Sequence, residues 1–86
     1  EKIMDNLQNI VEAILFASGV PVRRSEILEK LPDEASRRDL DNVISKIAKK
    51  YSGDSGIVLQ IFNDKIQFAS NSNYADIVSE IQAYHW

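Results

Sequence analysis

The chain contains no cysteine and a single histidine among its 86 residues. Without cysteine, disulfide bonds, thiolate metal sites and a cysteine nucleophile are excluded, and the composition suits a reducing compartment. The histidine, His85, has no partner that would make it a ligand or a base, so we expect a tail residue there. No apolar run approaches the roughly 20 residues that a membrane-spanning helix needs.

Groupings of residues typical of enzymes are also missing from the sequence. Asp39 and Asp41 lie two positions apart on a predicted helix, so their carboxylates do not face each other. The loop glycines Gly53 and Gly56 are not followed by Lys-Ser or Lys-Thr, which argues against a phosphate-binding loop. The sequence therefore predicts no catalytic residue, no metal site and no cofactor.

Size and charge indicate one small globular domain. Eighty-six residues can enclose one modest core, and the apolar fraction of 44% and the charged fraction of 27% are those of a globular protein. The formal net charge is −3, from 10 basic and 13 acidic residues. A slightly acidic chain is unsuited to coating nucleic acid generally, although it can still carry a local basic face.

Apolar residues recur with helical spacing in three segments of the first half of the chain. The first helix is predicted from about Asp5 to Ser18, with Gly19 as the residue that ends it. A shorter helix follows from about Arg24 to Leu31, and a third, the most regular of the three, spans about Arg37 to Tyr51. Ser36 begins the third helix with a motif that resembles a capping box.

The second half predicts two strands and a last helix. Ile57–Phe62 and Lys65–Ser70 alternate as strands around the two-residue turn Asn63-Asp64. A final helix, from Tyr74 to about Ala83, is expected to be anchored by its apolar residues Tyr74, Ile77, Val78 and Ile81. Three helices, a two-stranded β-hairpin wing and a C-terminal helix are the order of an α+β winged helix-turn-helix. The expected core residues are Ile14, Ile27, Leu28, Leu31, Leu40, Val43, Ile44, Ile47, Leu59, Ile61, Ile66 and Phe68.

One reading of this fold is a DNA-binding transcriptional regulator, in which the third helix enters the major groove. Its outward face offers four side chains for base or phosphate contacts: Arg38, Asn42, Ser45 and Lys49. Asp39 and Asp41 interrupt that surface, and the wing tip places one cation, Lys65, beside one anion. We therefore keep DNA binding as the alternative and expect it to be weak and not sequence-specific.

The other reading starts from the first helix, whose apolar band is wider than that of an ordinary surface helix. One small core cannot cover the whole band, so we expect Ile10 and Ile14 to point inward and the rest to meet a partner or a twin subunit. The candidates for this interface are Met4, Leu7, Val11, Leu15 and Phe16. Alternatively, Phe16 folds back over the second helix or the C-terminal tail.

The run Glu12–Gly19 followed by Pro21-Val22 resembles the opening signature of the family of segregation and condensation protein B, ScpB. Further similar segments follow in the same order: the helix ending at Tyr51, the strands Gly56–Ile61 and Ile66–Ser70, and the helix start Tyr74–Val78. The resemblance covers nearly the whole chain from about Leu7 onward.

This resemblance implies a bacterial cytoplasmic, nucleoid-associated protein with two winged-helix domains, of which residues 1–86 are the N-terminal one and the second is absent. Members of the family are not enzymes. They dimerise and bind the kleisin ScpA, in a complex that regulates the SMC ATPase during chromosome condensation and partition. The resemblance thus implies a homodimer that binds ScpA and, through it, SMC. The charge pattern of the third helix and the wing separately predicts weak or no direct DNA binding, and the lack of a long apolar run predicts no membrane partner. The wing tip Asn63-Asp64 departs from the glycine pair frequent in the family, a change that the same turn tolerates.

Overall fold

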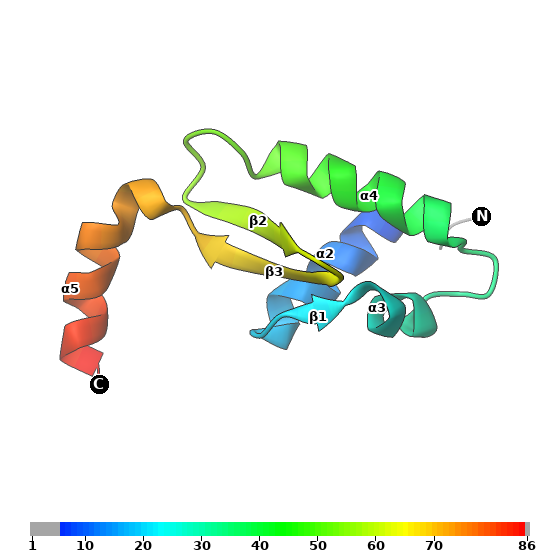
Figure 1. The fold of residues 1–86 in the computed structure, drawn as a ribbon, viewed down its shortest axis with the longest axis horizontal. Helices are drawn as coiled ribbons and strands as arrows, with labels where there is room; N and C mark the ends of the chain where they lie inside the picture. Colours follow the sequence, from blue (N-terminus) through cyan, green and yellow to red (C-terminus); the bar gives the residue numbers. More distant parts are fainter. Residues whose placement is uncertain (1–5, 86) are drawn as a thin grey trace.

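The computed structural model describes residues 6–85 and the side chains of residues 6–81 (Figure 1). The predicted winged-helix arrangement is confirmed, and a short first strand is added to it. The elements are α2 (Leu7–Ser18), β1 (Val22–Arg23), α3 (Arg24–Lys30), α4 (Arg37–Lys50), β2 (Ile57–Phe62), β3 (Lys65–Ser70), the 3₁₀ turn η1 (Ser72–Tyr74) and α5 (Ala75–His85). No helix in this part of the chain is both long enough and apolar enough to span a bilayer.

Local signals place the ends of the helices. The Ser36 hydroxyl accepts a hydrogen bond from the Asp39 amide at 3.1 Å, and the Asp39 carboxylate accepts one from the Ser36 amide at 2.9 Å. This reciprocal pair is the predicted capping box of α4. Gly19 ends α2 in the left-handed region, with φ of +69°, which glycine adopts without strain.

The hairpin pairs in the predicted register, with Leu59 opposite Phe68 and Ile61 opposite Ile66. Asn63 takes a φ of +55° in the turn, a conformation that asparagine tolerates. β3 is the central strand, because the sheet order is β1-β3-β2 and both neighbours are antiparallel to it.

The third strand, β1, was not predicted. Its two residues pair with the wing, Val22 opposite Ile66 and Arg23 opposite Lys65. Two residues are too few to show an alternating pattern, so the sequence indicated only an extended step after Pro21. The pairing connects the wing to the segment between α2 and α3.

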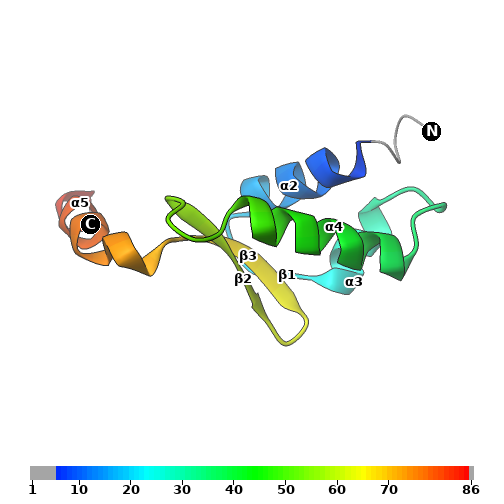
Figure 2. The ribbon, with the colours of Figure 1, turned by 90° about the horizontal axis from the view of Figure 1, so that it is seen from above.

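The core lies between α2, α3, α4 and one face of the sheet, with α2 and α4 packed side by side (Figures 1 and 2). Its buried residues are at most 8% exposed: Leu7, Val11, Leu15, Ile27, Leu31, Leu40, Val43, Ile44, Ile47 and Ile66. Of the other expected core residues, Ile14, Leu28, Leu59 and Phe68 pack against this cluster while partly buried. The prediction for Ile61 was wrong: it is 44% exposed, because it lies on the edge strand next to the turn.

The expected anchoring of the last helix was also wrong. α5 extends away from the body formed by the other helices and the sheet (Figures 1 and 2), and Ile77 and Ile81 are 64% and 57% exposed. The segment is fixed at its start, where the Tyr74 hydroxyl donates to the Asp54 carboxylate at 2.6 Å. Helical spacing predicted the helix correctly but not its direction, which the preceding turn sets.

Candidate interaction surfaces

The outward face of α2 is apolar and exposed in its C-terminal half. Phe16 is 78% exposed, Ala13 and Ala17 beside it are exposed, and the 62% exposed Val20 follows just beyond the end of the helix. Positions 13, 16 and 17 lie on one helix face because they are three and four residues apart. These four residues, which we call the α2 patch, carry no charge and include two small side chains that allow close approach.

The buried face of α2 corrects the predicted division of this helix. Leu7, Val11 and Leu15 were proposed as interface residues, but all three are core residues, between 0% and 3% exposed. Ile10 and Ile14, which were expected to point inward, are only partly buried at the margin. A helical wheel shows the width of an apolar band, whereas the position of α4 and β3 decides which part is covered. Phe16 remains on the surface, and Met4 lies outside the described residues.

A polar cluster fixes α2 against α4 in this orientation. Lys50 Nζ lies 3.1 Å from Glu12 Oε1, and the Tyr51 hydroxyl donates to Glu12 Oε2 at 2.5 Å. The Tyr51 ring meets Phe68 edge to face, with 5.0 Å between the ring centroids. Sequence reasoning missed this cluster, because its members lie 38 and 39 residues apart.

The same contacts change the pKa values of the three polar groups. The hydrogen bond from Tyr51, aided by Lys50, lowers the pKa of Glu12 despite the opposing effect of burial. The Glu12 carboxylate accepts a hydrogen bond from each of the two groups, and these bonds raise the pKa of Tyr51 and the pKa of Lys50. The charged state of Glu12 is therefore part of what holds α2 on α4.

The candidate DNA-contacting residues of α4 are all exposed: Arg38, Asn42, Ser45 and Lys49. The two acidic residues nearby are engaged elsewhere. Asp39 caps the helix, and Asp41 Oδ1 lies 3.2 Å from Nε of Arg24. The structure thus brings the four side chains to one surface. Because Asp39 and Asp41 are engaged in these contacts, they oppose DNA binding at that surface less than the sequence suggested.

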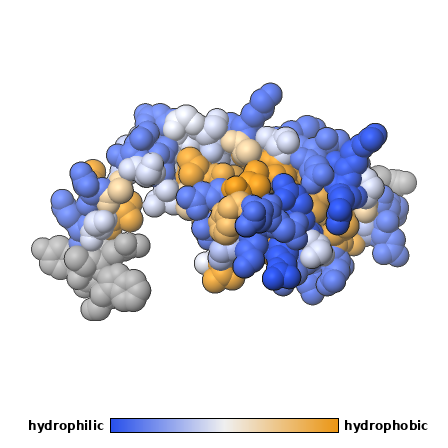
Figure 3. Space-filling view, in the orientation of Figure 1, coloured by the Kyte–Doolittle hydropathy of each residue, from blue (hydrophilic) through white to orange (hydrophobic). Residues whose placement is uncertain are grey.

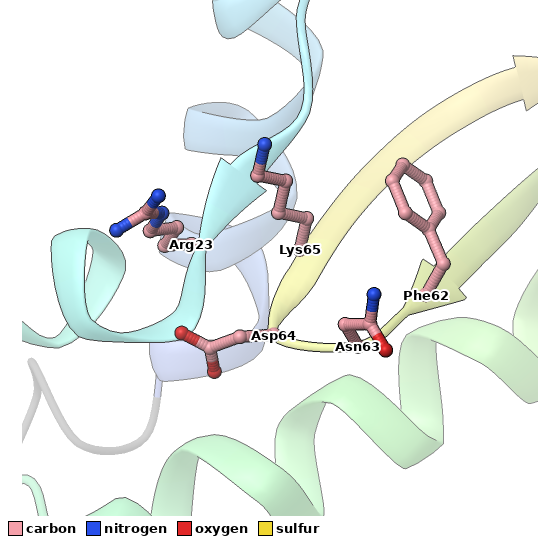
Figure 4. A pocket seen from close by; sticks show the side chains of 5 residues that line it. All are labelled: Arg23, Phe62, Asn63, Asp64 and Lys65. Carbon is pink, nitrogen blue, oxygen red and sulfur yellow. The ribbon is translucent and has the colours of Figure 1, made fainter.

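The tip of the wing forms an exposed hollow of about 350 Å³ (Figure 4). It is lined by Arg23, Phe62, Asn63, Asp64 and Lys65, all of them exposed. Within the described residues, no three His, Cys, Asp or Glu side chains gather in a way that could hold a metal ion.

Comparison with known proteins identifies the family. The model of the family described as segregation and condensation complex subunit ScpB matches residues 9–84. The chain belongs to the ScpB family. The resemblance noted in the Glu12–Gly19 run is therefore confirmed.

Two curated ScpB relatives match over most of this chain. It is 33% identical over 69 residues to segregation and condensation protein B of Caldanaerobacter subterraneus subsp. tengcongensis, and 23% identical over 78 residues to that of Clostridioides difficile. These alignments cover 79% and 90% of this chain but 40% and 44% of the relatives. The chain therefore spans less than half the length of the curated ScpB proteins it matches.

A solved ScpB structure has the same fold. It is described as a crystal structure of a dimer of the ScpB N-terminal domain complexed with ScpA peptide. It matches with a TM-score of 0.76 at 26% sequence identity, covering 86% of this chain and 88% of the other. The α-helical and three-stranded architecture described above is thus that of the ScpB N-terminal domain.

Proposed function

We propose that this chain is a non-enzymatic subunit of a bacterial SMC–ScpA–ScpB complex, acting in chromosome condensation and segregation by homodimerising and binding an ScpA-type kleisin. The observation that carries the proposal is the match over 86% of the chain to an ScpB N-terminal domain described as a dimer with ScpA peptide. Membership of the ScpB family supports the non-enzymatic role. An SMC complex acts on the chromosome, which would place the protein in the cytoplasm at the nucleoid.

We further propose that the chain is the N-terminal winged-helix domain of a longer, two-domain protein. The support is that the chain aligns with 40% and 44% of its two curated relatives, and with 88% of a structure described as an N-terminal domain. On this proposal, this domain makes only some of the contacts that the whole protein makes with the kleisin. Dimerisation of the whole protein would be the role of this domain.

The α2 patch is the surface we assign to the dimer. A twofold interface brings the same residues of both copies together, so it favours a self-complementary surface without charge. Phe16 is the large apolar side chain of this patch, and Ala13 and Ala17 allow a second helix to approach its backbone. Since Phe16 faces away from the core, covering it costs the protomer no internal contact.

A DNA-binding regulator is the second candidate, supported by the exposed positions of Arg38, Asn42, Ser45 and Lys49 on α4. We infer weak and sequence-independent DNA binding, because the wing tip still sets Asp64 beside Lys65. Titration of labelled duplexes at physiological salt tests this. Binding at about 10⁻⁸ M or tighter, lost in the Arg38→Ala, Lys49→Ala double variant, would favour the regulator instead.

The main proposal is tested by sedimentation velocity and by calorimetric titration with the ScpA-type kleisin of the same organism. We expect a dimer at about 100 µM protein, well above the micromolar range of a moderate interface, and a saturable complex with the kleisin. A chain that is monomeric at that concentration and also fails to bind the kleisin would contradict the proposal.

A further inference from the structure

The outer edge of the sheet is formed by β2, a six-residue strand that, within residues 6–85, pairs with another strand on one side only. All six residues pair with β3 without interruption, so no bulge distorts the strand. It contains no charged residue and no proline. Natural proteins usually protect a free edge with lysine, proline or a bulge, because the unpaired backbone groups accept another strand. β2 has none of these three protections. A helix can also cover an edge, and α4 does contact β2, but it leaves the side chains near both ends of the strand exposed, Ile57 by 40% and Ile61 by 44%.

Two hydrogen bonds show which backbone groups face the free edge. On the β1 side, the Arg24 amide donates to the Asp64 carbonyl at 3.0 Å. Backbone groups alternate in direction along a strand, so Ile66, two residues after Asp64, also faces β1. The pair between Ile66 and Ile61 is consequently one without hydrogen bonds between β3 and β2.

The other end of the hairpin gives the same alternation. The Asn71 amide donates to the Gly56 carbonyl at 2.9 Å, so Gly56 and every second residue after it bond to the β3 side. The alternate residues Ile57, Leu59 and Ile61 therefore direct their N–H and C=O groups away from β3, toward the open edge.

The same three residues add exposed apolar surface. Ile57 is 40% and Ile61 is 44% exposed, and Leu59 between them is half-buried. Hydrophobic surface gathers in the middle of the molecule where β2 lies beside α4 (Figures 1 and 3). Phe62, on the opposite face of the strand, is 43% exposed and lies directly across from Lys65 (Figure 4).

We propose that an extended segment of the ScpA-type kleisin adds to this edge as a fourth strand beside β2. This inference rests on the proposed function and specifies where its peptide partner binds. Unpaired backbone donors and acceptors select another extended strand, whereas the α2 patch offers side chains only and suits a folded second copy. A related domain is described as a dimer complexed with ScpA peptide, and the α2 patch and the β2 edge of this chain would supply one surface for each of those two contacts.

The edge also specifies the sequence of its occupant. Apolar residues at alternate positions would lie beside Ile57, Leu59 and Ile61, because side chains along a strand alternate between faces. On the other face, an acidic residue of the bound segment at the hairpin end would lie two strand spacings, about 10 Å, from Lys65 on β3. The acidic side chain and the lysine side chain together can bridge that gap and form an ion pair.

The test compares two isoleucine-to-lysine variants in titrations with the same organism's ScpA-type kleisin, as the whole protein and as overlapping peptides. Ile61→Lys places a charge at the edge, where isoleucine is 44% exposed, and Ile77→Lys places the same charge on α5, where isoleucine is 64% exposed. We expect Ile61→Lys to weaken binding by at least about tenfold and Ile77→Lys to leave it within about twofold. Circular dichroism checks that both variants are folded.

Backbone methylation of the bound peptide tests the strand geometry on the unaltered protein. Methylating peptide nitrogens one at a time should abolish binding at every second position and leave binding unchanged at the positions between, because only alternate N–H groups face β2.

The outcomes separate this inference from the proposed function. If the wild type binds the kleisin but neither this alternation nor the loss of binding in Ile61→Lys is seen, the β2 edge is not the binding site, and the proposed function stands. If the wild type binds no kleisin, the kleisin part of the proposed function fails. Loss of the dimer in Ile61→Lys alone would show that a second copy occupies β2, which overturns the inference.

Discussion

Replacing Phe16 by alanine should dissociate the dimer and leave the protomer folded. A buried phenylalanine covers about 150–250 Å², so a side chain that is 78% exposed has roughly 150 Å² to place against a partner. At about 25 cal/mol per Å², that area is worth at most about 4 kcal/mol per protomer. Association costs offset part of this, and the loss of as little as about 1.4 kcal/mol weakens a dimer tenfold.

The neighbouring residue supplies a matched control. Leu15 is 3% exposed, so Leu15→Ala should lower the free energy of unfolding by about 2–5 kcal/mol. Phe16→Ala should change the stability of the isolated protomer by less than about 0.5 kcal/mol. Substitution at Leu15 is thus expected to shift the unfolding equilibrium, and substitution at the adjacent Phe16 is expected to shift the equilibrium between monomer and dimer.

Sedimentation velocity from about 1 to 100 µM, with urea unfolding at both limits, separates the two effects. The unfolding midpoint of the wild type should rise with protein concentration, because association stabilises the folded chain, and that of Phe16→Ala should not. A Phe16→Ala variant that sediments as the wild type does would refute the assignment of the α2 patch. A loss of stability as large as that of Leu15→Ala would show instead that Phe16 packs within its own chain.

Three further perturbations test the fold. Ile44→Ala should lower the free energy of unfolding by about 2–5 kcal/mol in urea titrations, since Ile44 is 2% exposed, and a value near zero would contradict its place in the core. Gly19→Ala should cost about 1 kcal/mol through its φ of +69° alone, because an added Cβ meets no atom within 4 Å; an unchanged midpoint would mean the backbone is not left-handed there. The folded-state pKa of Glu12 lies below its usual 4.5, so its ionised form stabilises the fold above that pH, and the stability is lost as the pH falls below it. Glu12→Gln should therefore be less stable near neutral pH and should lose less on acidification than the wild type, which unfolding at several pH values measures.

Local features of this protein were determined by the sequence alone. The capping box of Ser36 and Asp39, the glycine stop at Gly19 and the hairpin around Asn63 all depend on residues within a few positions of one another. Hydrogen bonds and backbone preferences over such short separations do not depend on the rest of the fold, so pattern reasoning located them. The family, too, was indicated by a short continuous segment, the Glu12–Gly19 run.

The surfaces through which the protein acts were decided by tertiary structure. Phe16 was predicted as an interface residue and is exposed, but Leu7, Val11 and Leu15 carry the same kind of helical signal and are buried. The difference arises from where α4 and β3 meet α2, a choice fixed by contacts such as that between Glu12 and Tyr51, 39 residues apart.

The free edge of β2 shows the same dependence on distant segments. Ile61 has the alternation of a core residue, yet it is 44% exposed because β1 pairs with β3 and leaves β2 outermost. Strand order is a property of segments far apart in the chain, and no local pattern encodes which strand will lack a neighbour. The sequence therefore determined the elements and the family, whereas the assembly of those elements decided which apolar residues remain available to a partner.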